Sequence, residues 1–205
     1  AAIMFTDIVG WTITMTKDEP RAIELVKNQE TLLIPIVDKF NGKIIKRMGD
    51  GYLIEYFSSV EAVECAVEIQ QAIKQYNSNK DNLEFHVRIG IHLGDILIMG
   101  DDIIGDGVNV ASRIEPLADK GGICISNEVY RSISAQKDIL TASLGEYELK
   151  NIVEKWHIFR VFLDKDEYQS WAEKSFSQKK IFERKSKTLK RVVFTLFFLV
   201  IILVN

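Results

Sequence analysis

The first forty residues show both of the periodicities from which secondary structure is predicted. An uninterrupted apolar run from Ala1 to Phe5 predicts a buried strand. Between Pro20 and Phe40 the apolar residues recur every three or four positions. That spacing predicts an amphipathic helix, with a kink or the end of a turn at Pro35.

The same two patterns continue to residue 161. Apolar stretches bounded by turn-forming residues predict strands at 43–48, 52–57, 85–92, 123–126, 140–149 and 155–161, with 95–99 as the return of the strand that ends at 92. Helical spacing predicts helices at 58–76, 105–117 and 128–133. This order of elements predicts an α+β fold, with a ferredoxin-like (βαββαβ-type) core and extra C-terminal strands.

The last forty residues have a different composition. Residues 174–191 hold eight Lys and Arg against one acid, and residues 192–204 are apolar except for Thr195. The apolar run is shorter than the roughly 20 residues that span a bilayer, but it follows a basic cluster and meets the chain end rather than a turn. We therefore expect a folded domain at 1–163, a basic, helical linker at 164–191, and the start of a transmembrane helix at 192–205. A C-terminal helix docked on the domain is the alternative.

The charge distribution limits the classes of partner. The whole chain carries −3, and because residues 174–191 carry +7, the rest carries −10. An acidic domain does not suit general nucleic-acid binding, which needs a basic face on the domain itself. Cys65 and Cys124 lie in apolar stretches without metal-ligand spacing, which is typical of reduced, buried thiols. His86 and His92 have no acid or Cys at ligand spacing and are interpreted as core or strand residues.

Two aspartates are candidates for metal binding. Asp7 follows the first strand in Phe-Thr-Asp-Ile-Val-Gly, and Asp50 lies at a predicted hairpin tip in Gly-Asp-Gly. Carboxylates at strand ends can hold hard divalent cations. For Asp50 alone, ordinary turn chemistry would explain the residue equally well.

An amide and a guanidinium follow on one predicted helix. Asn109 and Arg113 are four residues apart, so their side chains leave the same helix face. Such a pair can hold a ribose and a phosphoryl group during transfer. A surface ion pair of Arg113 with Glu115 is the alternative.

These motifs, in this order, resemble the catalytic domain of class III adenylate and guanylate cyclases over roughly residues 1–162. The resemblance implies two Mg²⁺ or Mn²⁺ ions per site, bound by Asp7 and Asp50, with Ile8 in the metal site. One ion would activate the ribose 3′-hydroxyl and the other would hold the triphosphate. It also implies catalytic roles for Asn109, which orients the ribose, and for Arg113, which stabilises charge on the α-phosphoryl oxygens.

The resemblance also bears on the substrate. Lys46 and Asp102 match positions that read adenine in the family, where guanine would favour Glu in place of Lys46. Asp101 adjoins Asp102, so the two roles could be exchanged. Lys150 matches a triphosphate contact, although Asn151 replaces the usual glycine after it.

The family builds each site from two chains, which implies a homodimer. We therefore expect an adenylate cyclase that converts ATP to 3′,5′-cyclic AMP and pyrophosphate, with its catalytic domain in the cytoplasm, tethered to the membrane. A guanylate cyclase is the nearest alternative, and a catalytically silent module for dimerisation or regulation is the second. A diguanylate cyclase would need a Gly-Gly-Asp/Glu-Glu-Phe hairpin, which the sequence lacks.

Overall fold

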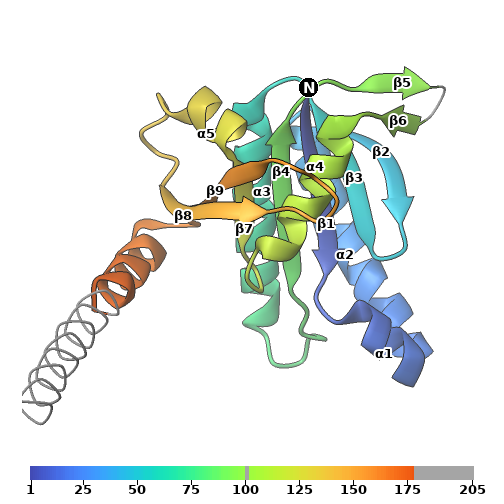
Figure 1. The fold of residues 1–205 in the computed structure, drawn as a ribbon. Coiled ribbons are helices and arrows are strands. Elements are labelled where there is room, and N and C mark those ends of the chain that lie inside the picture. The colour runs from blue at the N-terminus through green and yellow to red at the C-terminus, as the bar shows by residue number, and fades with distance from the viewer. Residues whose placement is uncertain (100–101, 178–205) are drawn as a thin grey trace, which may run out of the picture. The chain divides into compact units, whose positions relative to one another are not determined.

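The computed structural model describes residues 1–99 and 102–177. The chain divides into two compact units, Ala1–Leu163 and the residues from Asp164 onward. The first unit is built on one seven-stranded sheet (Figure 1). Its strands, in spatial order, are β2 (Lys43–Met48), β3 (Gly51–Tyr56), β1 (Ala2–Ile8), β4 (Val87–Leu93), β7 (Ile123–Ser126), β9 (Lys155–Val161) and β8 (Thr141–Glu148).

The predicted α+β core is confirmed. Only β4 and β7 pair in parallel, and every other neighbouring pair in the sheet is antiparallel. The order β2-β3-β1-β4 is that of a βαββαβ unit, to which β7, β9 and β8 are added. The helices are α1 (Trp11–Lys17), α2 (Glu19–Lys39), α3 (Ser59–Asn77), α4 (Asp106–Ile114) and α5 (Asn127–Ile133), with a 3₁₀ turn, η1 (Glu115–Leu117), directly after α4.

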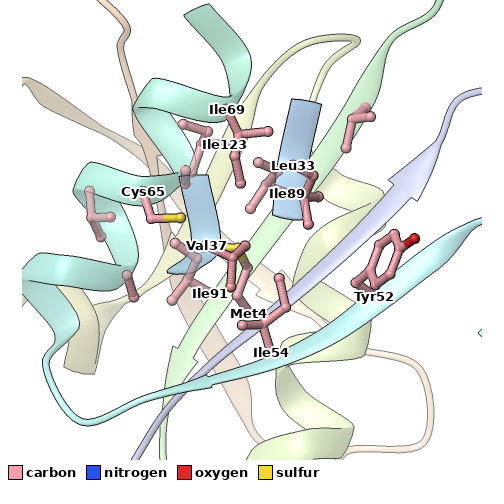
Figure 2. Packing of buried hydrophobic residues seen from close by; sticks show 14 of the residues in the cluster. Met4, Leu33, Val37, Tyr52, Ile54, Cys65, Ile69, Ile89, Ile91 and Ile123 are labelled. Carbon is pink, nitrogen blue, oxygen red and sulfur yellow. The ribbon is translucent and has the colours of Figure 1, made fainter. Parts of the chain in front are cut away.

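Successive side chains of β1 point to opposite faces of the sheet. Met4 (Figure 2) and Ile8 belong to the large core that packs under α2 and α3. Ile3 and Phe5 pack with Ala111 of α4, which covers the other face of the sheet (Figure 1). The next odd-numbered residue, Asp7, therefore lies on the face that α4 covers. The strand that forms the core thus also delivers a carboxylate to the site.

Helix α4 lies unusually close to the sheet because β4 has a glycine beneath it. A Cβ built on Gly90 would collide with the backbone nitrogen of Glu115 and would lie 2.9 Å from the carbonyl oxygen of Ala111. Only glycine leaves room for such a backbone approach. One face of α4 packs on the sheet, and the opposite face is exposed. The buried residues of the helix are Gly107, Val110, Ala111 and Ile114.

One local prediction was wrong and one element was missed. Pro35 lies inside α2, which continues to Lys39, and Leu33 and Val37 on either side of it are fully buried. The predicted kink at Pro35 stays a prediction. Residues 95–99 are not the return of β4. Strand β4 already has β1 and β7 as its two neighbours, so β5 (Leu97–Met99) pairs instead with β6 (Asp102–Ile104) in a separate hairpin. Helix α1 was not predicted, and it has no buried residue from which a helical period could be read.

The second unit is described by itself. Residues 165–177 are helical, and the Asp164 side chain accepts a hydrogen bond from the Glu167 backbone N–H at 2.8 Å, as at a helix start. The rest of the predicted linker, 178–191, and the apolar segment 192–205 lie outside the described residues. Within 1–99 and 102–177, none of the helices has the length and apolar character that crossing a membrane requires.

Candidate active site

Asp50 is folded back against the end of β1. Its Oδ2 accepts a hydrogen bond from the backbone N–H of Ile8 at 3.0 Å, and the residue is only 8% exposed. The β2–β3 turn that carries it is fixed by β1–β3 pairing and by the Thr6 hydroxyl, which accepts from the Tyr52 N–H at 3.1 Å. The hairpin tip and the end of β1, far apart in sequence, therefore bring the two predicted metal-binding aspartates together.

The two carboxylates repel each other. Burial, and then the neighbouring Asp7 carboxylate, raises the pKa of Asp50 to about 6. A buried acid beside a half-buried one is a donor set that suits a divalent cation, because the ion offsets both the burial of Asp50 and the repulsion between the two charges. Among the described residues, no three His, Cys, Asp or Glu side chains gather into a fuller cage. Two carboxylates that leave positions for water and phosphate oxygens fit Mg²⁺ or Mn²⁺ better than a closed structural site.

The turn that holds Asp50 requires a glycine before it. Gly49 has φ of 66°, a left-handed conformation that side chains disfavour. The ring of Trp11, at the start of α1, lies 3.7 Å from the position that a Cβ of Gly49 would take, and its Nε1 donates to the carbonyl oxygen of Ala22 at 3.3 Å. Trp11 thus packs beside the hairpin that carries Asp50.

Arg88 and Glu115 extend the acidic pair, and neither was predicted. Arg88 of β4 is the direct cross-strand partner of Asp7, and its Nη2 donates to Asp7 Oδ2 at 2.6 Å. On its other side, Arg88 Nε lies 2.7 Å from Oε1 of Glu115, the first residue of η1. Glu115 is 8% exposed, and burial raises its pKa to about 7 in spite of the guanidinium beside it. The alternating Val-Arg-Ile-Gly-Ile of β4, with a charge between buried positions, was the available signal.

A second group of predicted residues lines a cleft beside α4. Asn109 and Arg113 lie on the exposed face of the helix and, together with Lys150, border a cleft of about 610 Å³. Glu115 is paired with Arg88, so it does not form the surface ion pair with Arg113 that was the alternative. Asp7 and Asp50, both described, are not among the residues that line this cleft. One chain therefore presents two separate halves of the predicted machinery.

Lys150 lies in the turn between β8 and β9. Asn151, in the place of the usual glycine, has φ of 63°. Asparagine is one of the few residues that adopts this left-handed conformation readily. The substitution therefore keeps the backbone turn that glycine would give, and Lys150 stays on the cleft.

The predicted base-reading residues lie on neighbouring elements. Lys46 is an exposed residue of β2, and Asp102 begins β6, which contacts β2. Asp101 lies outside the described residues, so the possible exchange of roles between the two acids stays a prediction.

The remaining candidates are structural. His92 is buried in β4, with Nδ1 2.9 Å from the Ser126 hydroxyl and its ring edge-on to Trp156. His86 lies just before β4 and contacts Glu84 at 3.0 Å, so it is not the strand residue that was expected. The two cysteines are free and buried, as predicted.

Comparison with known proteins matches this geometry. The family described as adenylate and guanylate cyclase catalytic domain matches residues 1–164. Putative adenylate cyclase 3 of Rhizobium meliloti (strain 1021) is 40% identical over 161 residues, 78% of this chain and 27% of that protein. This chain thus corresponds to little more than a quarter of that relative's length.

Two solved structures show the same fold. The adenylate/guanylate cyclase/hydrolase from Silicibacter pomeroyi has a TM-score of 0.72 at 32% identity, covering 80% of this chain and 96% of that one. The adenylyl cyclase CyaB from P. aeruginosa has a TM-score of 0.67 at 23% identity, covering 81% and 95%. With the family match spanning the whole first unit, the chain belongs to the family of adenylate and guanylate cyclase catalytic domains.

Proposed function

We propose that residues 1–163 form an adenylate cyclase domain that converts ATP to 3′,5′-cyclic AMP and pyrophosphate. The observation that carries this proposal is the pairing of Asp50 with the end of β1 beside Asp7, together with a cleft bordered by Asn109, Arg113 and Lys150. A carboxylate pair that can hold cations and a cleft that offers an arginine and a lysine to phosphates are what phosphoryl transfer needs.

In this proposal each candidate site residue has a defined role. Asp7 and Asp50 would hold two Mg²⁺ or Mn²⁺ ions, with the backbone at Ile8 beside them, and these ions supply Lewis-acid activation of the 3′-hydroxyl and of the triphosphate. Asn109 positions the ribose so that its 3′-oxygen faces the α-phosphorus. Arg113 places its planar fork against the α-phosphoryl oxygens, where negative charge builds up in the transition state. Lys150 neutralises the pyrophosphate that leaves.

The proposal includes a homodimer in which each site takes its metal half from one chain and its cleft half from the other. This is supported by the separation of the two halves within one chain, where the carboxylate pair does not line the Asn109–Arg113 cleft. A two-fold axis that brings opposite halves together would create two equal sites. A single chain would have no complete site.

ATP is proposed over GTP because of Lys46 and Asp102. A lysine donor suits a ring nitrogen of adenine, and a carboxylate accepts from its exocyclic amine. Both residues lie on elements in contact, β2 and β6. The name of the Rhizobium relative, a putative adenylate cyclase, agrees with this choice.

The test is a turnover assay of the purified chain with Mn²⁺ and either ATP or GTP, in which cyclic product and pyrophosphate are both measured. We expect cyclic AMP from ATP at a kcat/KM at least tenfold above that for GTP. Preference for GTP would make the chain a guanylate cyclase. No product from either nucleotide, with a folded dimer, would support the silent module.

Membrane attachment is proposed from the sequence alone. The basic cluster before residues 192–204 places the catalytic domain on the cytoplasmic side by the positive-inside rule. Expression of the full chain and of residues 1–177, followed by membrane fractionation and alkaline extraction, tests it. Recovery of the full chain in the same soluble fraction as the shorter one would contradict it.

A further inference from the structure

Arg88 lies between two carboxylates, one partly exposed and one buried. On one side it holds Oδ2 of Asp7, whose side chain is 35% exposed, and on the other it contacts Oε1 of Glu115, which is buried. Its own side chain is 28% exposed. The guanidinium is always charged and its fork can meet both acids at once. Because Asp7 and Arg88 are directly paired across β1 and β4, the backbone fixes the distance between them.

This arrangement has an electrostatic consequence for a cation at Asp7. A positive charge in contact with a carboxylate lowers that carboxylate's affinity for a metal ion, since guanidinium and metal compete for the same negative charge. Glu115 supplies a second negative charge to Arg88, in a site where burial limits screening by water. With Glu115 in place, Arg88 can orient Asp7 while its charge is largely compensated.

The position of Glu115 connects this effect to the rest of the machinery. It is the first residue of η1, directly after α4, which carries Asn109 and Arg113. Gly90, on the same strand as Arg88, is what lets α4 and the start of η1 approach β4 this closely. Contact between Glu115 and Arg88 therefore depends on the seating of α4.

We propose that Arg88 and Glu115 are positioning residues for the metal site: Arg88 orients the Asp7 carboxylate, and Glu115 compensates the charge of Arg88 so that Asp7 keeps its affinity for a divalent cation. The proposal rests on the proposed function, because it takes Asp7 as a metal-binding residue. Two residues outside the predicted site would then control both metal affinity and turnover. Suitable variants can separate these two effects.

The test is direct Mn²⁺ binding to the chain of residues 1–205, measured by electron paramagnetic resonance at pH 8, which lies above the pKa of Glu115. The variant Asp50→Asn defines binding that does not come from the site. Glu115→Gln keeps the shape and leaves Arg88 uncompensated, so we expect Mn²⁺ affinity to fall about tenfold. Asp119→Asn is the control, since Asp119 accepts from Arg160 of β9 at 2.6 Å in an exposed arginine–acid pair away from Asp7. We expect it to bind Mn²⁺ as the parent does.

The double variant Arg88→Met/Glu115→Gln separates charge from orientation. With the uncompensated guanidinium removed, Mn²⁺ affinity should return to within about threefold of the parent, while kcat at saturating Mn²⁺ falls at least tenfold because Asp7 is no longer held. A structural defect alone would not restore affinity in the double variant. If Glu115→Gln does not fold, Arg88→Lys gives the second test, since one ammonium cannot bridge both acids and kcat should fall.

Each outcome decides the proposal. Equal Mn²⁺ affinity in the parent and in Glu115→Gln overturns it, and so does a double variant as weak as the single one. An unchanged kcat in Arg88→Lys also overturns it, as does a parent that binds no more Mn²⁺ than Asp50→Asn. If the affinities change as expected but no cyclic nucleotide forms, the proposed function fails and the positioning role stands. If cyclic AMP forms and the affinities do not change, the reverse holds.

Discussion

At the scale of single residues, Asp50 is kept in a position that is unfavourable without a cation. It is nearly buried, next to another acid, and its pKa is raised to about 6. A folded-state pKa above the unfolded value of about 3.9 means that the native chain binds more protons than the unfolded chain between pH 4 and 6. Metal-free stability therefore falls as pH rises through that window.

The variant Asp50→Asn should show this cost directly. Without metal at pH 8, we expect the free energy of unfolding to rise by about 1–3 kcal/mol, because a buried charge is replaced by an amide that can still accept from Ile8. Cyclase activity should be lost. Denaturant unfolding of the parent, of Asp50→Asn and of the control Asp38→Asn, an exposed acid of α2, measures the difference. An Asp50→Asn variant less stable than its parent would argue that the carboxylate is stabilising there.

The same residue predicts a pH dependence of metal binding. Below pH 6 Asp50 becomes protonated, and a proton must leave before a cation can bind, so the apparent Mn²⁺ affinity should fall up to about tenfold for each pH unit. Titrations of Mn²⁺ at pH values from 5 to 8 would show the affinity begin to fall near pH 6. In Asp50→Asn this fall in affinity should be absent. An affinity that stays constant from pH 5 to pH 8 would mean that Asp50 is not buried beside Asp7 in solution.

Sequence motifs supplied the candidate residues of the site but not Arg88 and Glu115. Asp7, Asp50, Asn109 and Arg113 could be proposed because each has a local signature that matches the family. A charge between buried positions of β4 marks Arg88 as unusual, but its role depends on a cross-strand pairing between segments 81 residues apart, which no local pattern encodes. The left-handed turn at Asn151 likewise became clear only from its φ.

At the scale of elements, the site depends on how closely α4 approaches β4. The variant Gly90→Ala places a methyl group against the backbone of Glu115, and backbone cannot rotate away as a side chain can. We expect α4 and η1 to be displaced, with a loss of about 2–4 kcal/mol in the free energy of unfolding and a larger proportional loss of activity. Thermal unfolding and turnover of Gly90→Ala check this. An unchanged melting temperature would show that α4 is seated less tightly than the structure has it.

Element prediction was reliable where burial was strong. The buried strands β1, β3 and β4 and the long helices α2 and α3 followed their apolar periods. Helix α1 buries none of its residues, so it left no period to read. The pairing of β5 with β6 was missed for another reason, since it follows from both edges of β4 being occupied, which is a property of the completed sheet.

At the scale of the whole molecule, the proposed homodimer with two half-sites on each chain makes complementation the decisive experiment. Asp50→Ala removes the metal half and Asn109→Ala the cleft half, so each homodimer should be almost inactive. In an equal mixture with random exchange, half of the dimers are heterodimers, and each heterodimer has one intact site of two. We therefore expect about a quarter of parental activity to return.

The matched control is a mixture of Asp7→Ala with Asp50→Ala. Both changes damage the metal half, so no heterodimer of these two chains has an intact site, and the mixture should stay inactive. Size-exclusion chromatography with differently tagged chains confirms that heterodimers form in both mixtures. An inactive Asp50→Ala/Asn109→Ala mixture that contains heterodimers would mean that one chain holds the whole site. The separation of the carboxylate pair from the Asn109–Arg113 cleft would then have to be closed by movement within that chain rather than by a partner.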